Sequence, residues 1–214
     1  MLINHHPSDA TLTAYAAGTL PEALGLVTAA HLSFCPVCRG VVALAESVGG
    51  SMLDDLAPVD MDDDALTRVL ARGDVAEIPT VTLVREPELP GPLKYCDFGR
   101  SWLVAPGLRW RPLRTSGRTG GLAWGGLAWG GLLVAQPGRR FPRHAHTGLE
   151  LTCVLRGSFV DANGRYGVGD LAEPEGDHDD PPWIDSAEPC ICVIASEGFR
   201  LGGALGLLQR MIGL

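Results

Sequence analysis

Three residues near the N-terminus have the types and the spacing of zinc ligands. His31, Cys35 and Cys38 follow the pattern H-x3-C-x2-C. Positions i, i+4 and i+7 of a helix share one face, so these side chains can converge on one ion. Zinc usually takes four ligands and combines thiolates with imidazoles. We therefore expect a fourth ligand from the N-terminal segment, either His5 or His6.

The C-x2-C pair has a second interpretation as a thiol redox motif. A thioredoxin-like motif would need a βαβ context, whereas both flanks of this pair look helical. Pro36 can also begin a new helix directly after Cys35, and thiolates are stabilised at a helix N-terminus. These features favour zinc over redox chemistry.

A second group of potential metal ligands lies in the C-terminal half. Residues 138–157 fit the pattern G-x5-H-x-H-x3-E-x6-G without a gap, which places His144, His146 and Glu150 in phase. Residues i and i+2 of a strand point to the same face, so the two imidazoles can share one interior. His178 comes later, as expected if another strand crosses that interior. Three imidazoles and one carboxylate suit Zn, Mn, Fe, Ni or Cu.

The elements that must position these two groups differ in kind. We expect helices over 8–18, 21–33, 36–50 and 62–72, the first capped by Ser8 or Asp9. Residues 76–92 contain four prolines and predict an extended linker. From about residue 93, short apolar runs alternate with Gly and Pro turns, and Asn163-Gly164 indicates a hairpin. This pattern predicts a sandwich or barrel.

Charge is concentrated in the helical third. Residues 1–75 hold ten acidic and three basic residues, a net charge of −7, whereas the rest of the chain carries −1. An acidic region does not bind nucleic acid by neutralising phosphates. It can cover a basic protein partner, although the same charge would also suit a merely solvated surface.

The remaining sequence features favour a cytoplasmic protein. No apolar run is long enough for a membrane helix, and the first residues lack the features of a signal peptide. A disulfide framework is therefore not expected. We interpret the four other cysteines as small buried hydrophobes, with Cys190 and Cys192 on one strand face and a sensing role for that pair left open. These four are Cys96, Cys153, Cys190 and Cys192.

Both ligand groups resemble motifs of known families. The H-x3-C-x2-C pattern in its helical context resembles the zinc-binding anti-sigma domain, and residues 138–157 resemble the first cupin motif. The second cupin motif is matched less well, because Gly169-DLAE-Pro174 and the approach to His178 are each one residue short and no Asn follows at the expected place. Taken in this order, the two modules resemble the ChrR family of anti-sigma factors over essentially the whole chain.

The resemblance implies an α+β multidomain protein. It places a small N-terminal all-α zinc-binding bundle at residues 1–85 and a C-terminal all-β cupin barrel at 93–214. It implies that the helices bind and inhibit an extracytoplasmic-function sigma factor. The cupin would sense singlet oxygen or related oxidative stress and release that factor. The implied ligands are His6, His31, Cys35 and Cys38 for the N-terminal zinc, and His144, His146, Glu150 and His178 for a cupin metal, zinc or another divalent transition metal.

An enzyme is the main alternative, because many cupins are dioxygenases or isomerases. Such a site needs an open coordination position and placed acid or base groups. Besides the ligands, the motif region offers Arg140, Arg143 and Asp177, which are more simply explained as solvated surface charges. A storage or ligand-binding cupin would not need an acidic helical region with its own zinc site. We therefore expect a regulator and not an enzyme.

Overall fold

The structure is a computed structural model of the 214-residue chain. It describes residues 2–73, 89–115, 128–141, 144–146, 148–174 and 181–201, with the backbone alone for 144–146 and 199–201. Most of the expected linker, most of the repeated GGLAW segment at 120–129 and the C-terminal tail therefore lie outside the described residues.

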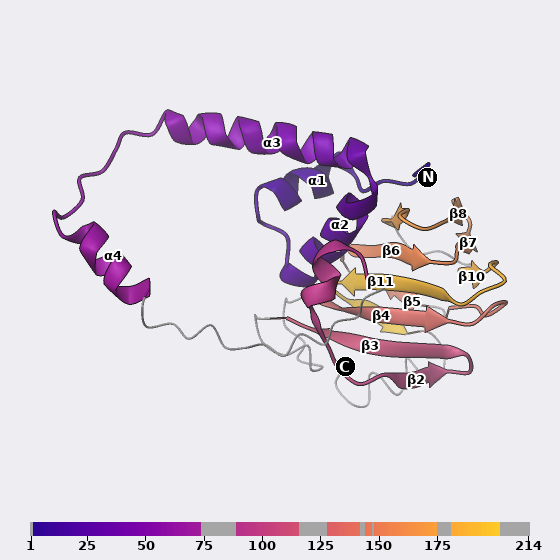
Figure 1. Cartoon of the computed structure of the whole chain (residues 1–214). Coiled ribbons are helices and arrows are strands. Elements are labelled where there is room, and N and C mark those ends of the chain that lie inside the picture. Colours follow the sequence, from indigo (N-terminus) through magenta and orange to yellow (C-terminus); the bar gives the residue numbers. More distant parts are fainter. Residues whose placement is uncertain are drawn as a thin grey trace.

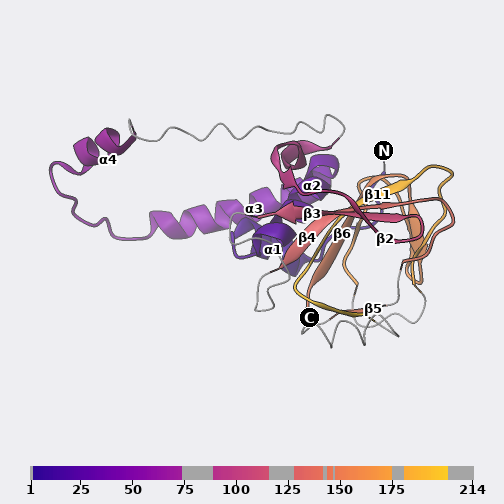
Figure 2. The same cartoon turned by 90° about the horizontal axis from the view of Figure 1, so that it is seen from below.

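All four predicted helices are present, and Figure 1 shows three of them stacked on one side of the strands. The Ser8 side chain accepts a hydrogen bond from the Thr11 N–H and caps the first helix, as expected. The third helix continues beyond the expected Gly50. The fourth stands apart from the rest of the molecule in both views (Figures 1 and 2). Their bounds are α1 Asp9–Ala16, α2 Glu22–Phe34, α3 Pro36–Asp54 and α4 Ala65–Gly73.

The strands begin where the sequence predicts and pair antiparallel throughout the described part of the chain. The main sheet has seven strands in the order β1-β3-β4-β11-β6-β9, with β2 added on β3. Their bounds are β1 Asp97–Phe98, β2 Trp102–Ala105, β3 Leu108–Arg114, β4 Trp129–Ala135, β6 Glu150–Arg156, β9 Leu171–Ala172 and β11 Cys190–Ser196.

Two smaller sheets complete the cupin-like half. One has the order β10-β7-β8 and contains the predicted hairpin, with Asp161 opposite Gly164. The other pairs β12 with β5, and Figure 2 shows β5 on the far side from β3 and β11. The pairings among the described strands do not join these sheets into one closed barrel. The bounds are β5 His144–His146, β7 Phe159–Asp161, β8 Gly164–Tyr166, β10 Trp183–Ile184 and β12 Phe199–Leu201.

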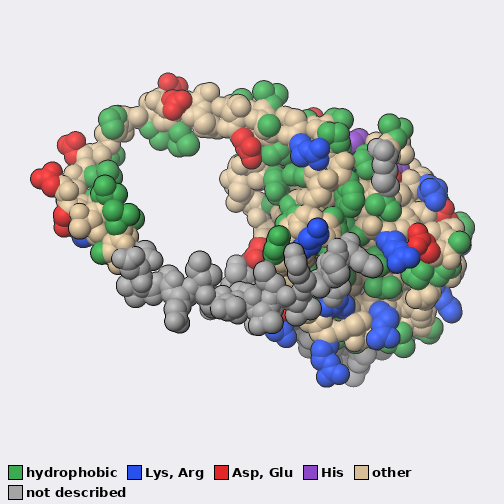
Figure 3. Space-filling model, viewed as in Figure 1, with side chains coloured by type: hydrophobic (Ala, Val, Ile, Leu, Met, Phe, Trp, Pro, Cys, Tyr) green, Lys and Arg blue, Asp and Glu red, His purple; other side chains and the backbone are tan. Residues whose placement is uncertain are grey.

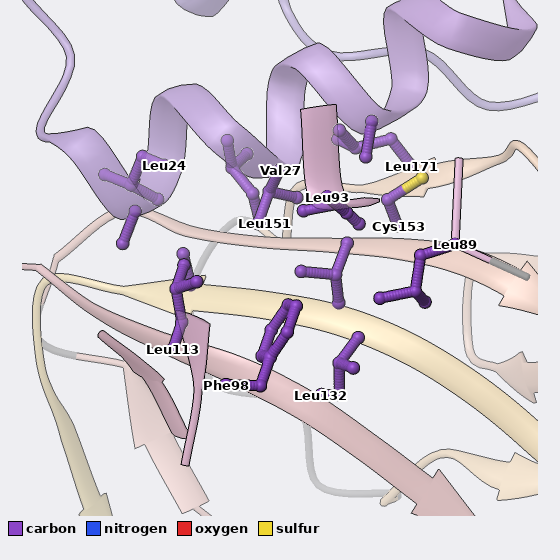
Figure 4. Packing of buried hydrophobic residues seen from close by; sticks show 14 residues of the cluster. Leu24, Val27, Leu89, Leu93, Phe98, Leu113, Leu132, Leu151, Cys153 and Leu171 are labelled. Carbon is purple, nitrogen blue, oxygen red and sulfur yellow. The ribbon is translucent and has the colours of Figure 1, made fainter. Parts of the chain in front are cut away.

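Helix α2 and the main sheet share one hydrophobic core, which the sequence did not predict. Leu24 and Val27 of α2 are fully buried and face Leu151 of β6 (Figure 4). Gly130 of β4 allows this close approach, because a Cβ there would lie only 3.2 Å from Cβ of Ala23. Burial of this apolar face is the main force that holds α2 on the sheet.

The end of the expected linker also belongs to this core. Leu89 is buried, and residues Gly91–Tyr95 form a short 3-10 helix, η1, that packs against α2. The expectation of an extended linker up to residue 92 is therefore wrong for its last residues, because Leu89 and Leu93 bury their side chains beside α2.

Three of the four remaining cysteines are fully buried, and Cys96 is partly buried. The Sγ atoms of Cys190 and Cys192 lie 3.5 Å apart, which confirms that they share a strand face. The neighbouring Cys190 thiol and burial together raise the pKa of Cys192, and burial raises that of Cys153. Both are therefore protonated and packed as small hydrophobes at neutral pH. Among the described helices, none has the length and apolar character to cross a bilayer.

Candidate metal centre

Four residues from three segments meet at the junction of α2 and α3. His6 comes from the segment before α1, His31 from the last turn of α2, Cys35 from the single residue between the helices, and Cys38 from the first turn of α3. The ligand atoms of all four lie within 4.8 Å of one another. His6 is exposed, and the other three are buried beside a small core of Leu12, Leu32 and Val42.

The distances within this cluster fit a single tetrahedral ion. Nδ1 of His6 lies 3.4 Å from Sγ of Cys35 and 3.3 Å from Sγ of Cys38. Nε2 of His31 lies 3.3 Å from Sγ of Cys38. A tetrahedron with ordinary Zn–S and Zn–N bonds has N–S edges of about 3.5 Å. The donor set and its spacing therefore suit zinc.

The structure also separates the two histidines between which the sequence could not choose. His5 stacks on the ring of Tyr166 with centroids 4.1 Å apart, away from the thiols. His6, next in the chain, faces both cysteines. Adjacent residues of an extended segment point to opposite sides, so only one of the pair can reach the cluster.

The backbone at Cys35 explains how two thiols reach one point. Cys35 has an extended conformation, φ −101° and ψ 104°, which ends α2 and caps α3, and Pro36 occupies the first turn of α3. Its Sγ accepts a hydrogen bond from the N–H of Cys38 at 3.4 Å. Both sulfur atoms thus lie at a helix N-terminus, where the peptide dipoles stabilise negative charge.

His31 is fixed in one tautomer by a partner that the sequence did not reveal. Its Nδ1 lies 2.8 Å from the carbonyl oxygen of Gly169, in the turn before β9. This contact makes Nδ1 the donor and leaves the lone pair of Nε2 directed at the cluster, as metal-bound histidines require. Burial lowers the pKa of His31, although the bond to Gly169 opposes this, so the ring is neutral at neutral pH.

Cys38 shows why the cluster favours a cation. Burial, together with the hydrogen bond and the charge of Cys35, raises the pKa of Cys38 to about 12. Two thiolates side by side in a buried site are costly without a positive charge. A divalent ion removes this cost, because coordination stabilises the deprotonated thiols.

The second predicted group is described only in part. His144 and His146 occupy alternate positions of β5, where they are paired with Leu201 and Phe199, and only their backbone is described. Glu150 begins β6 and is buried. His178 lies outside the described residues. A cupin metal on these four residues therefore stays a prediction.

The chain thus combines a helical part that carries a His2Cys2 cluster with a cupin-like part made of antiparallel sheets. Residues 100–197 match the family described as the ChrR cupin-like domain. The chain is 40% identical to the anti-sigma-E factor ChrR of Cereibacter sphaeroides, over 92% of this chain and 91% of that protein. It is also similar to a chain in the crystal structure of Rhodobacter sphaeroides SigE in complex with the anti-sigma ChrR, with 36% identity, a TM-score of 0.72, and coverage of 91% of this chain and 99% of that one.

These similarities extend through both the helices and the strands. The chain belongs to the ChrR family of anti-sigma factors, which confirms the resemblance drawn from the two motifs.

Proposed function

We propose that this chain is a zinc-binding anti-sigma factor. Its helices bind an extracytoplasmic-function sigma factor in the cytoplasm and keep it from RNA polymerase, and its cupin-like half releases that factor under singlet oxygen or related oxidative stress. The similarity to a chain crystallised with a sigma factor supports a role as regulator and not as enzyme. In this role, zinc on His6, His31, Cys35 and Cys38 would join the helices as a structural ion.

An uncovered apolar surface on α3 and α4 carries this proposal. Five exposed residues of α3 follow helical spacing and form one stripe along its length, and three more lie on α4. Figure 3 shows hydrophobic side chains exposed on both helices, in separate groups. Exposed large apolar residues gathered on a helix face in this way are typical of a protein interaction site. We call it the apolar stripe: Val37, Val41, Leu44, Val48 and Met52 on α3, with Leu66, Val69 and Leu70 on α4.

Acidic residues border the apolar stripe. Six aspartates lie within residues 54–64, at the end of α3 and in the segment that joins it to α4, and all are exposed. Arg68 pairs with two of them, Asp62 and Asp64, at 2.9 and 3.1 Å. A partner with basic residues around an apolar centre would complement this surface, because an apolar core with a charged rim is typical of specific interfaces. A DNA-binding sigma factor has that chemistry.

The cupin-like half supports the sensing role through its predicted metal. The ligands would be His144, His146, Glu150 and His178, and the ion zinc or another divalent transition metal. Glu150 is buried at the start of β6, and the histidine pair lies at alternate positions of β5. Damage to this group would alter the sheet on which α2 packs, and so would reach the helices that hold the sigma factor.

Binding can be tested with the full-length chain and its sigma factor. Val48→Asp places a charge in the centre of the apolar stripe and should abolish co-purification. Leu103→Asp is the matched control, because Leu103 is similarly exposed, 64% against 57% for Val48, but lies on β2. Unchanged binding by Val48→Asp would contradict the proposed surface, as would equal loss in both variants.

Sensing can be tested with a reporter driven by the same sigma factor. The double change His144→Ala and His146→Ala removes the group that the oxidant would damage, so the reporter should give the same signal with and without singlet oxygen. Wild-type induction in that variant would contradict a sensor built on the cupin metal.

A further inference from the structure

The turn before β9, β9 itself and the residue that follows form a short segment, 167–173, that contacts the N-terminal metal centre from the side of the strands. Two of its main-chain groups reach the metal-binding segments directly. The carbonyl of Gly169 accepts from His31 Nδ1 at 2.8 Å, and the N–H of Leu171 donates to the carbonyl of His5 at 3.1 Å. The first fixes the ring of a predicted ligand, and the second holds the backbone next to His6.

Asp170 in this segment binds the backbone that precedes His6. The residue is only 3% exposed. Its Oδ1 accepts hydrogen bonds from the N–H groups of Asn4 and His5 at 2.7 and 3.0 Å. Its Oδ2 accepts from the N–H of Gly167 at 2.8 Å. Bonds from N–H groups to a buried carboxylate are stronger than neutral ones, so Asp170 ties the N-terminal segment firmly to the turn.

Glu173 holds the backbone on the other side of His6. Its carboxylate accepts from the N–H of Ser8 at 2.8 Å, from the Ser8 hydroxyl at 2.8 Å and from the Thr11 hydroxyl at 2.9 Å. Ser8 is the residue that caps α1. His6 is therefore fixed between two anchors, Asp170 before it and Glu173 after it, and both anchors belong to the strand half.

Gly169 can present its carbonyl to His31 only because it lacks a side chain. Its φ is +86°, a conformation that other residues rarely adopt. A Cβ at this position would lie 2.5 Å from Cδ1 of Ile3 and 2.9 Å from Cβ of Phe34. The turn is thus packed closely between the N-terminal segment and the end of α2.

We propose that Asp170 is a positioning residue for the N-terminal metal site, and that segment 167–173 couples this site to the strand half. The segment holds His6 and His31 at once, and it ends two residues before 175–180, which include His178. A displacement of this segment would move both imidazoles relative to the thiols. The inference rests on zinc binding at the N-terminal cluster and is independent of sigma binding.

The test compares Asp170→Asn with Asp161→Asn in the full-length protein. The carboxylate accepts from three N–H groups, those of Asn4 and His5 on one oxygen and that of Gly167 on the other. The amide oxygen of Asn can replace only one of these two oxygens, because the NH2 group in the place of the other cannot accept a hydrogen bond. Asp161 is the matched control, because within the described residues its carboxylate accepts a local hydrogen bond from the N–H of Asn163, at 2.7 Å, and none from the N-terminal segment. Loss of groups that orient metal ligands typically weakens metal binding by about 10–100-fold.

Two readouts distinguish positioning from general stability. In chelator competition, Asp170→Asn should bind Zn2+ at least about tenfold more weakly than wild type, and Asp161→Asn should match wild type. In the Co2+-substituted protein, the visible absorption bands should shift only in Asp170→Asn, since they report ligand geometry. Equal zinc affinity and an unchanged cobalt spectrum in Asp170→Asn would overturn the proposal.

Hydrogen exchange on the wild-type chain tests the coupling without any substitution. Removal of zinc should accelerate exchange of the Leu171 N–H, because its acceptor, the His5 carbonyl, lies next to a freed ligand. Exchange in β4, which lies away from the cluster in the main sheet, should stay unchanged. Exchange at Leu171 that does not depend on zinc would contradict the coupling. A wild-type chain that binds no zinc would instead refute the metal site itself, whatever its sigma affinity.

Discussion

Helices α2 and α3 are separated by one residue and carry similar apolar side chains, yet the structure uses them in opposite ways. Leu24 and Val27 of α2 are fully buried against the main sheet. Leu44 and Val48 of α3 are 68% and 57% exposed. The apolar residues of α2 complete a core within the chain, whereas those of the apolar stripe on α3 are exposed and, in the proposed function, form a core with the sigma factor. The metal centre lies at the junction between the buried helix α2 and the largely exposed helix α3.

The largest effect is expected at that point. Cys38→Ala removes a thiolate from a four-ligand site, so the protein should lose about one equivalent of zinc per chain. Structural zinc sites contribute about 10 kcal/mol or more to the folded state, and the arrangement of α2 and α3 should fail with it. Elemental analysis measures the zinc, and co-purification measures sigma binding.

Cys153→Ala serves as the control for that experiment. Cys153 is as buried as Cys38 but lies in β6, so its loss should leave the zinc content unchanged. Full zinc content in Cys38→Ala would show that the ion is held elsewhere.

The contrast in burial predicts a contrast in stability. Leu24→Ala should lower the free energy of unfolding by about 2–5 kcal/mol, because it leaves a cavity between α2 and the sheet. Leu44→Ala should change it by no more than about 0.5 kcal/mol, as for most exposed positions. Urea denaturation of the free protein compares the two, and equal losses would show that α3 is also covered in solution.

The substitution on α3 that hardly changes the stability of the free protein should have a clear effect on sigma binding. Leu44→Ala should weaken the complex by about 1–3 kcal/mol, because it removes an apolar contact from the centre of the proposed interface. Isothermal titration with the sigma factor measures this loss, and Leu103→Ala provides an equally exposed control on β2. Equal sigma affinity in Leu44→Ala and Leu103→Ala would contradict a role of the exposed face of α3 in binding.

A smaller and graded effect is expected from pH. Because the pKa of Cys38 is raised to about 12, its thiol is protonated in the metal-free chain at neutral pH, and zinc must displace that proton. Zinc affinity should therefore rise with pH by at least about tenfold, or 1.4 kcal/mol, per unit. Chelator competition at several values near neutral pH measures the slope, and a flat profile would exclude Cys38 as a thiolate ligand.

Local features of the fold and the site were predictable from the sequence. The H-x3-C-x2-C pattern predicted that His31, Cys35 and Cys38 meet, although they do so where α3 begins after Cys35, as the alternative at Pro36 allowed, and not on the face of one helix. The Ser8 cap and the Asn163-Gly164 hairpin were found where turn chemistry placed them. Such features depend on residues a few positions apart, and periodicity and capping preferences report on these directly.

Contacts between distant parts of the chain were not predictable. Nothing in the sequence indicates that the Gly169 carbonyl meets His31, or that Asp170 holds the backbone of His5, because more than a hundred residues separate each pair. The same is true of α2, whose apolar run is equally compatible with a separate helical bundle. The choice between His5 and His6 also depended on tertiary packing, since Tyr166 takes one of the two rings.

The packing of α2 on the main sheet limits how proteins of this design can be recombined. A chimera that replaced residues 93–214 with another sensor would leave Leu24 and Val27 against a foreign surface, and the excised strands would lose the cover over Leu132 and Leu151. New sensors can be exchanged only if they bring a matching apolar face, including a position as small as Gly130 where the helix comes closest. The exposed residues of the apolar stripe are not part of that core, so they can be exchanged without changing the fit between α2 and the sheet.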